Sequence, residues 1–150
     1  MAKGEAKLMY PGLANFYKTW SPIAYTLVRV FVGIIMIMHV MPKLNNGPAA
    51  VAGAFSKNYG LEPAIFFAYG AIFLEAVGGA ALILGLFTRF FAAALAVEML
   101  IAMFAAHWAK GFMASQGGYE FVALLGFVLF AIALRGGGPY SVDRQIGKEL

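Results

Sequence analysis

The sequence predicts an all-α membrane protein, a bundle of four transmembrane helices with both termini in the cytoplasm. Of its 150 residues, 62% are hydrophobic and 12% are charged, whereas soluble domains are about 45 to 50% apolar and about 25% charged. The apolar residues gather in four long runs, and most basic residues lie on one side of those runs. These observations exclude an ordinary soluble globule and make the lipid membrane the first expected partner.

The four apolar runs predict membrane spans over about residues 22–41, 64–87, 89–110 and 118–136. A helix needs roughly 20 residues to cross the hydrocarbon layer, which is roughly 30 Å thick. The first three runs reach this length directly. The fourth is apolar over 121–134 and approaches it only when extended at both ends. We therefore expect a single membrane domain over residues 1–150.

The basic residues predict the orientation, because cytoplasmic segments carry an excess of Lys and Arg. Seven lie at the N-terminus, in the 87–90 turn and at the C-terminus: Lys3, Lys7, Lys18, Arg89, Arg135, Arg144 and Lys148. Three lie on the other side: Lys43, Lys57 and Lys110. The basic residues do not form the clustered patch that nucleic-acid binding requires, so no nucleic-acid partner is expected.

The N-terminal region admits two alternatives. A cleaved signal peptide competes with the first span, but the apolar run is long, contains Arg29 and ends at Pro42, well before the cleavage-like segment 52–54. Before that run, aromatic and aliphatic residues at helical spacing predict a segment on the inner leaflet, with a disordered tail as the alternative. These residues are Leu13, Phe16, Tyr17 and Trp20.

The connections follow from their lengths. The 87–90 turn is so short that the second and third spans must form an antiparallel hairpin, with Thr88 expected to cap the third span. Residues 42–63 form a longer outer loop that opens with turn residues and is predicted to contain a surface helix from Ala49 to Lys57.

Three charged residues lie inside the predicted spans: Arg29, Glu75 and Glu98. An ionised group near a helix centre costs roughly 2.5 to 3.5 kcal/mol on insertion scales, so a compensating interaction is needed. Their similar depths predict one catalytic cluster in which Arg29 pairs with a carboxylate and the carboxylates share a proton. Small residues on the same faces, such as Gly33 and Gly79, would let the helices approach closely. The alternative is that the charges only hold the helices in register.

A second polar group is predicted at the outer end of the bundle. It consists of His39, Lys43, His107, Lys110, Tyr119 and Glu120. A histidine there can hydrogen-bond a quinone carbonyl or transfer a proton. Nine residues separate Glu98 from His107, however, which places them on opposite faces of a regular helix. His107 is then assigned to another groove, a subunit contact or the headgroup region.

The sequence contains no cysteine, which excludes iron-sulfur ligation, thiolate zinc sites and thiol nucleophiles. Haem held by the two histidines and Cu(I) held by methionines are weaker alternatives to quinone, because neither ligand type occurs in a diagnostic spacing. No metal site is predicted.

Several segments, in order, resemble the DoxX family. They are Arg29, 39–44, 75–89, 107–112, 118–120 and 138–141, and the resemblance spans roughly residues 25–143. It implies a small four-helix protein of the bacterial inner (plasma) membrane, related to the DoxD subunit of thiosulfate:quinone oxidoreductase. It also implies a functional set consisting of Arg29, His39, Lys43, Glu75, His107 and Glu120. The role of Glu98 rests on the physical argument alone.

Three functions fit these observations. The leading hypothesis is a membrane subunit of a redox system that binds or reduces quinone together with a protein partner, using Arg29, Glu75 and Glu98 catalytically. His39, Lys43, His107 and Glu120 would bind the cofactor. The alternatives are a small transporter or proton pathway, and a scaffold that recruits soluble enzymes. A homo-oligomer is compatible with each.

Overall fold

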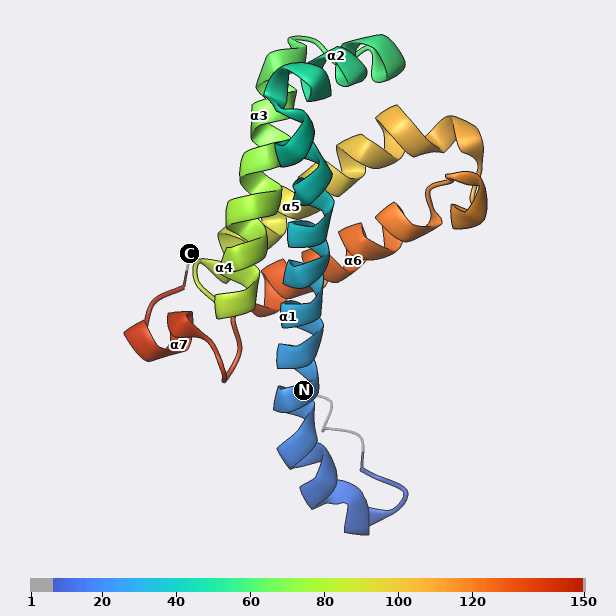
Figure 1. Ribbon diagram of the computed structural model, residues 1–150. Coiled ribbons are helices and arrows are strands. Elements are labelled where there is room, and N and C mark those ends of the chain that lie inside the picture. Colours follow the sequence, from blue (N-terminus) through green and yellow to red (C-terminus); the bar gives the residue numbers. More distant parts are fainter. Residues whose placement is uncertain (1–6, 150) are drawn as a thin grey trace, which may run out of the picture.

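The computed structural model describes residues 7–149, and that part of the chain is helical throughout, without strands (Figure 1). Lys3, one of the residues used to predict the orientation, lies outside the described residues. The α-helices are α1 (Ala14–Asn46), α2 (Pro48–Tyr59), α3 (Ala64–Phe73), α4 (Gly79–Leu84), α5 (Thr88–Ala102), α6 (Glu120–Arg135) and α7 (Val142–Ile146). Two π-helical turns, Leu74–Gly78 and Met103–His107, interrupt the second and third spans.

Three helical stretches are long and apolar enough to cross a membrane: Pro11–Asn46, Ala64–Leu84 and Thr88–Lys110. They coincide with the first three predicted spans. The fourth predicted span corresponds to α6, which has 16 residues and is about 24 Å long, shorter than the hydrocarbon layer. The fourth span therefore stays a prediction.

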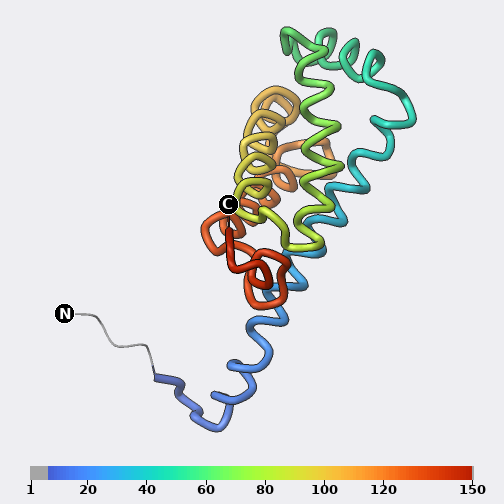
Figure 2. Tube along the Cα trace, turned by 90° about the vertical axis from the view of Figure 1, so that its left-hand side faces the viewer, coloured from blue at the N-terminus to red at the C-terminus, as the bar shows by residue number. Residues whose placement is uncertain are grey.

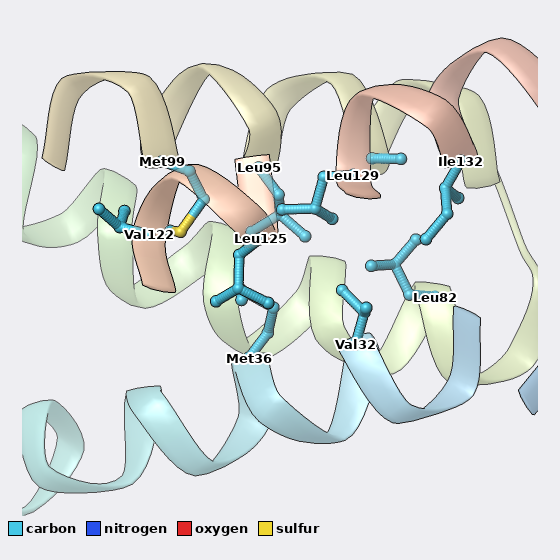
Figure 3. Packing of buried hydrophobic residues seen from close by; sticks show 10 residues of the cluster. Val32, Met36, Leu82, Leu95, Met99, Val122, Leu125, Leu129 and Ile132 are labelled. Atoms are coloured by element: carbon cyan, nitrogen blue, oxygen red, sulfur yellow. The ribbon is translucent and has the colours of Figure 1, made fainter. Parts of the chain in front are cut away.

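The helices form two antiparallel pairs. α1 runs beside α3 and α4, and the α5–α6 hairpin crosses this pair at a steep angle (Figure 1). Buried aliphatic side chains from α1, α4, α5 and α6 fill the space between the two pairs (Figure 3). The cluster includes Val32, Met36, Leu82, Leu95, Leu125, Leu129 and Ile132.

The predicted close approach of small residues is confirmed where α1 crosses α4. A Cβ atom added to Gly33 would lie 2.6 Å from the carbonyl oxygen of Gly79, and one added to Gly79 would lie 2.9 Å from the carbonyl oxygen of Gly33. The two backbones therefore touch at a point where a side chain would force them apart. This contact fixes the register between α1 and α4.

The N-terminal part of α1 is an ordered helix, not a disordered tail. Leu13 ends a short 3₁₀ turn, and Phe16, Tyr17 and Trp20 belong to the continuous helix that runs away from the bundle (Figures 1 and 2). All four side chains are exposed. The alternative of a disordered tail was wrong, because the helix is continuous through Pro22. The position of these residues on the inner leaflet stays a prediction.

The predicted surface helix in the outer loop is confirmed as α2. Pro48 occupies its first turn, and Gly60 ends it in the left-handed conformation. Glu62 holds the following corner, since its carboxylate accepts hydrogen bonds from the Ser56 hydroxyl and from the Ala64 backbone N–H. These hydrogen bonds lower the pKa of the Glu62 carboxyl below its ordinary value.

The opposite end of the bundle is closed by the C-terminal segment. Asp143, on α7, is fully buried and accepts hydrogen bonds from the N–H groups of Phe87 and Thr88 at 2.7 and 2.9 Å. It therefore caps α5, and the prediction that the Thr88 side chain does so was wrong. Arg89 donates to the carbonyls of Ala133 and Leu134 at the end of α6. The free backbone groups at the start of α5 and the end of α6 are thus hydrogen-bonded by residues distant in the sequence.

Candidate functional site

Arg29 does not join the predicted cluster with Glu75 and Glu98. It is 0% exposed, and its guanidinium donates to the carbonyls of Leu82 and Ile83 and, at 2.6 Å, to that of Tyr140. The last carbonyls of α4 lack partners within the helix and carry partial negative charge, so they attract a buried cation. Arg29 binds the end of α4 to the C-terminal segment.

The register of α1 against α4 explains why this prediction was wrong. Gly33 lies opposite Gly79, so moving one turn along α1 to Arg29 and one turn along the antiparallel helix to Glu75 leads in opposite directions. The two charges are therefore about two helical turns apart, roughly 11 Å along the axis. The limits of an apolar run do not reveal such an offset.

Glu75 pairs instead with Lys43. The Lys43 ammonium lies 2.7 and 2.6 Å from the two carboxylate oxygens, and it also donates to the carbonyl of His39 at 3.2 Å. Glu75 is 3% exposed. The long Lys43 side chain reaches back along α1 to meet it, which satisfies a charge that would otherwise be stranded in the apolar part of the bundle.

His107 lies on the same cavity as Glu98, contrary to the predicted placement on opposite faces. Both side chains line it. The reason is the π turn Met103–His107. A π turn absorbs an additional residue, which reduces the angular offset between the two positions from about 180° to roughly 80°.

The cavity has a volume of about 430 Å³ and lies between α1, the Leu74–Gly78 turn, α5 and α6, with α2 above it. Its ionisable lining residues are His39, Lys43, Glu75, Glu98 and His107. The remaining wall is mostly apolar. Its volume falls within the range of roughly 300 to 1,000 Å³ that small-molecule sites occupy. The structure thus brings together five of the seven predicted site residues.

Three polar side chains in the cavity are placed to interact with a ligand. One carboxylate oxygen of Glu98 is buried and has no hydrogen-bond partner among the described residues. The Nδ1 atom of His107 lies 2.7 Å from the Gly117 carbonyl and donates to it, so the neutral ring offers Nε2 as an acceptor. His39 stacks on Phe121 with ring centroids 6.2 Å apart.

Glu120 lies outside the cavity lining, although it was predicted to bind a cofactor. Its side chain is exposed and accepts a hydrogen bond from the Ala114 N–H at 3.0 Å. It stabilises the loop that carries Gly117, the hydrogen-bond partner of His107. Its position in the structure therefore indicates a structural role in this loop.

Two aromatic residues of α2, Phe55 and Tyr59, line the cavity and were missed in the sequence. Their spacing of four residues places them on one face of α2, where their rings lie 6.2 Å apart. That spacing was a usable signal. In the described part of the chain, no three His, Asp or Glu residues are grouped so as to hold a metal ion.

Comparison with known proteins identifies the family. The DoxX family model matches residues 24–108, more than half of the chain. The chain belongs to the DoxX family. It is also 30% identical over 138 residues to a protein of Haemophilus influenzae described as uncharacterized, and the alignment covers 90% of this chain and 99% of that protein. No solved structure matches it.

The DoxX match and the three apolar helices establish a membrane protein. All five ionisable residues of the cavity, from His39 to His107, lie within the matched DoxX region, whereas Glu120 and Asp143 lie beyond it. Eleven of the 17 residues that line the cavity therefore come from the matched DoxX region, and α6 with the loop before it supplies the other six.

Proposed function

We propose that this DoxX protein is the quinone-binding membrane subunit of a redox system, and that a partner protein exchanges electrons with the bound quinone. The observation that carries the proposal is the cavity itself. It combines a lysine-carboxylate pair, a second carboxylate with an oxygen that no described residue hydrogen-bonds, and a histidine whose Nδ1 donates to a carbonyl, all within an apolar bundle. A flat head group with polar atoms at opposite edges fits such a lining.

The lining residues can bind both forms of this ligand. A quinone supplies reversible uptake of two electrons and two protons at its two oxygen atoms. The Lys43 ammonium donates hydrogen bonds to carbonyl oxygens, and neutral His107 accepts one from a hydroxyl through Nε2. Glu98 accepts when ionised and donates when protonated. The residues on the cavity wall can thus hold and transfer the protons that accompany reduction.

The partner follows from the composition of the chain. Its sequence contains no cysteine, so it offers no thiol and no iron-sulfur ligands to donate electrons. We propose that the partner provides this function and contacts the cavity end of the bundle, where α2 and the 108–119 segment lie.

The proposed membrane orientation places the cavity in the outer half of the bacterial inner membrane. The end opposite the cavity carries α7, the 85–87 turn and the start of α1 (Figure 1). Six of the basic residues used in the prediction lie toward that end: Lys7, Lys18, Arg89, Arg135, Arg144 and Lys148. The exposed apolar face of α6, which includes Phe127 and Phe130, supports α6 as the fourth span. Both termini are then cytoplasmic.

The buried core favours this proposal over a proton pathway through the bundle. Met36, Leu82 and Leu95 are each 0% exposed and lie between the cavity and Arg29. Arg29 itself is committed to three carbonyls. The ionisable groups at the two ends therefore do not form a continuous polar route.

Quinone titration of the protein in lipid nanodiscs tests the proposal. We expect saturable binding that weakens roughly tenfold or more in Lys43→Met and Glu98→Gln, because each removes a polar group facing the ligand. Lys57→Met is the matched control, since Lys57 lies on α2 outside the cavity lining. Absence of saturable binding by the folded wild-type protein would refute the proposal.

A further inference from the structure

A second hollow adjoins the cavity. It is an apolar groove of about 270 Å³ between α3 and α5, beneath α2. Its walls are mostly aromatic, aliphatic or small residues, among them Phe66, Gly70, Ala94, Val97 and Ile101. Glu98 is the single ionisable carboxylate among its lining residues in the described chain. The groove is thus suited to a hydrocarbon chain and not to a polar ligand.

The groove and the cavity are immediate neighbours. They share six lining residues: Phe55, Tyr59, Ala71, Glu98, Ala102 and Ala106. Three of the shared residues are alanines, so the boundary between the two hollows carries only short side chains there. Glu98 lies at the junction, so a molecule that extends from one hollow to the other passes this carboxylate.

The groove opens on the surface that faces lipid. Phe66 is 69% exposed and Val97 is 57% exposed, and both lie on predicted membrane spans. A ligand dissolved in the bilayer therefore reaches the groove laterally, without crossing the polar surface of the membrane. The polar cavity is then the inner end of a route that begins in the hydrocarbon layer.

We infer that the groove holds the isoprenoid tail of the quinone whose head group occupies the cavity, and that the molecule enters between α3 and α5. This inference rests on the proposed function. It assigns the two hollows to the two parts of one amphipathic ligand: the polar cavity binds the head and the groove binds the tail. Phe55 and Tyr59 of α2 cover the bend between them.

Gly70 provides a precise test. Gly70 lines the groove and a Cβ atom added there meets nothing within 4 Å, so we expect the larger side chain of Gly70→Leu to occupy the groove. Gly53→Leu is the matched control, because Gly53 is equally free of neighbours and lines neither hollow. The probes are two benzoquinones with the same head group, one with a short isoprenoid tail and one with no tail, titrated into the protein in nanodiscs.

We expect the wild-type protein to bind the tailed quinone roughly tenfold or more tightly than the tail-less one. Gly70→Leu should abolish this preference while leaving the affinity for the tail-less quinone within about twofold, and Gly53→Leu should behave as wild type. Unchanged affinity of Gly70→Leu for the tailed quinone would assign the groove to bulk lipid and overturn the inference. So would an equal loss for both probes, or no preference in the wild type. If the folded wild type binds neither quinone, the proposed function fails and the inference fails with it.

Discussion

The ammonium of Lys43 lies 2.7 and 2.6 Å from the two carboxylate oxygens of Glu75 and joins α1 to the π turn of the second span. The pair is asymmetric, since the Lys43 side chain is 22% exposed and that of Glu75 is 4% exposed. The lysine retains a path to solvent, and the glutamate does not. Because of this difference, removing Lys43 and removing Glu75 should have unequal effects on the stability of the protein.

Lys43→Met is therefore expected to destabilise the protein by about 3 kcal/mol, because it strands a buried carboxylate. Glu75→Met should cost less, about 1 kcal/mol, since Lys43 can turn toward solvent. The double variant should be close to wild type, as apolar residues replace both charges. Unfolding in mixed detergent micelles measures all three free energies. Equal stability of wild type and Lys43→Met would contradict the ion pair.

Asp143→Ala is expected to lower the free energy of unfolding by about 2 kcal/mol, because a buried and a half-buried N–H group at the start of α5 lose their acceptors. Arg144→Ala, at an exposed neighbouring position, should change it little. Thermal unfolding in detergent compares the two variants. Quinone affinity at the remote cavity should be unaffected, and an Asp143→Ala protein as stable as wild type would refute the capping role.

Gly33→Ala should destabilise the protein by about 1 to 3 kcal/mol, because the new methyl group meets the backbone of Gly79. Gly53→Ala, where the added Cβ has open space, should be neutral or slightly stabilising in the interior of α2. The same unfolding assay applies. If both alanine variants behaved alike, α1 and α4 could not be in backbone contact at this point.

The orientation is testable by cysteine labelling, since the natural sequence contains no cysteine to interfere. We expect Ser115→Cys, at the cavity end, to react with a membrane-impermeant maleimide on intact spheroplasts. Lys148→Cys, at the opposite end, should react only after the membrane is opened. Labelling of both positions from outside would mean that α6 does not cross the membrane.

The sequence was sufficient for features that depend on local pattern. Apolar length predicted three helices of spanning length, and the turn residues at 45–48 led to the prediction of α2. Small residues four positions from the charges predicted a close approach of the helices, which the structure has at Gly33 and Gly79. Each of these follows from spacing within one segment, which is what a sequence displays directly.

Features that depend on relations between segments could not be predicted in the same way. The partner of Arg29 is set by the register of two helices, and the cap of α5 is Asp143, 55 residues beyond Thr88. The π turn Met103–His107 moves the His107 side chain to another face of the helix, and the spacing of the apolar residues gives no sign of it. Five of the residues that line the cavity were among the predicted site residues, but their grouping required the structure.

The quinone content of the protein extracted from its own membrane in native lipid tests the central claim most directly. The Lys43→Met, Glu75→Met double variant is the comparison, because it is expected to fold while removing both charges of the ion pair from the cavity. Mass spectrometry of the extracted lipids should show quinone in a stoichiometric amount with the wild type and a strong reduction with the double variant. A folded wild type free of quinone, or a folded double variant that retains the full amount, would contradict the assignment of this cavity to quinone.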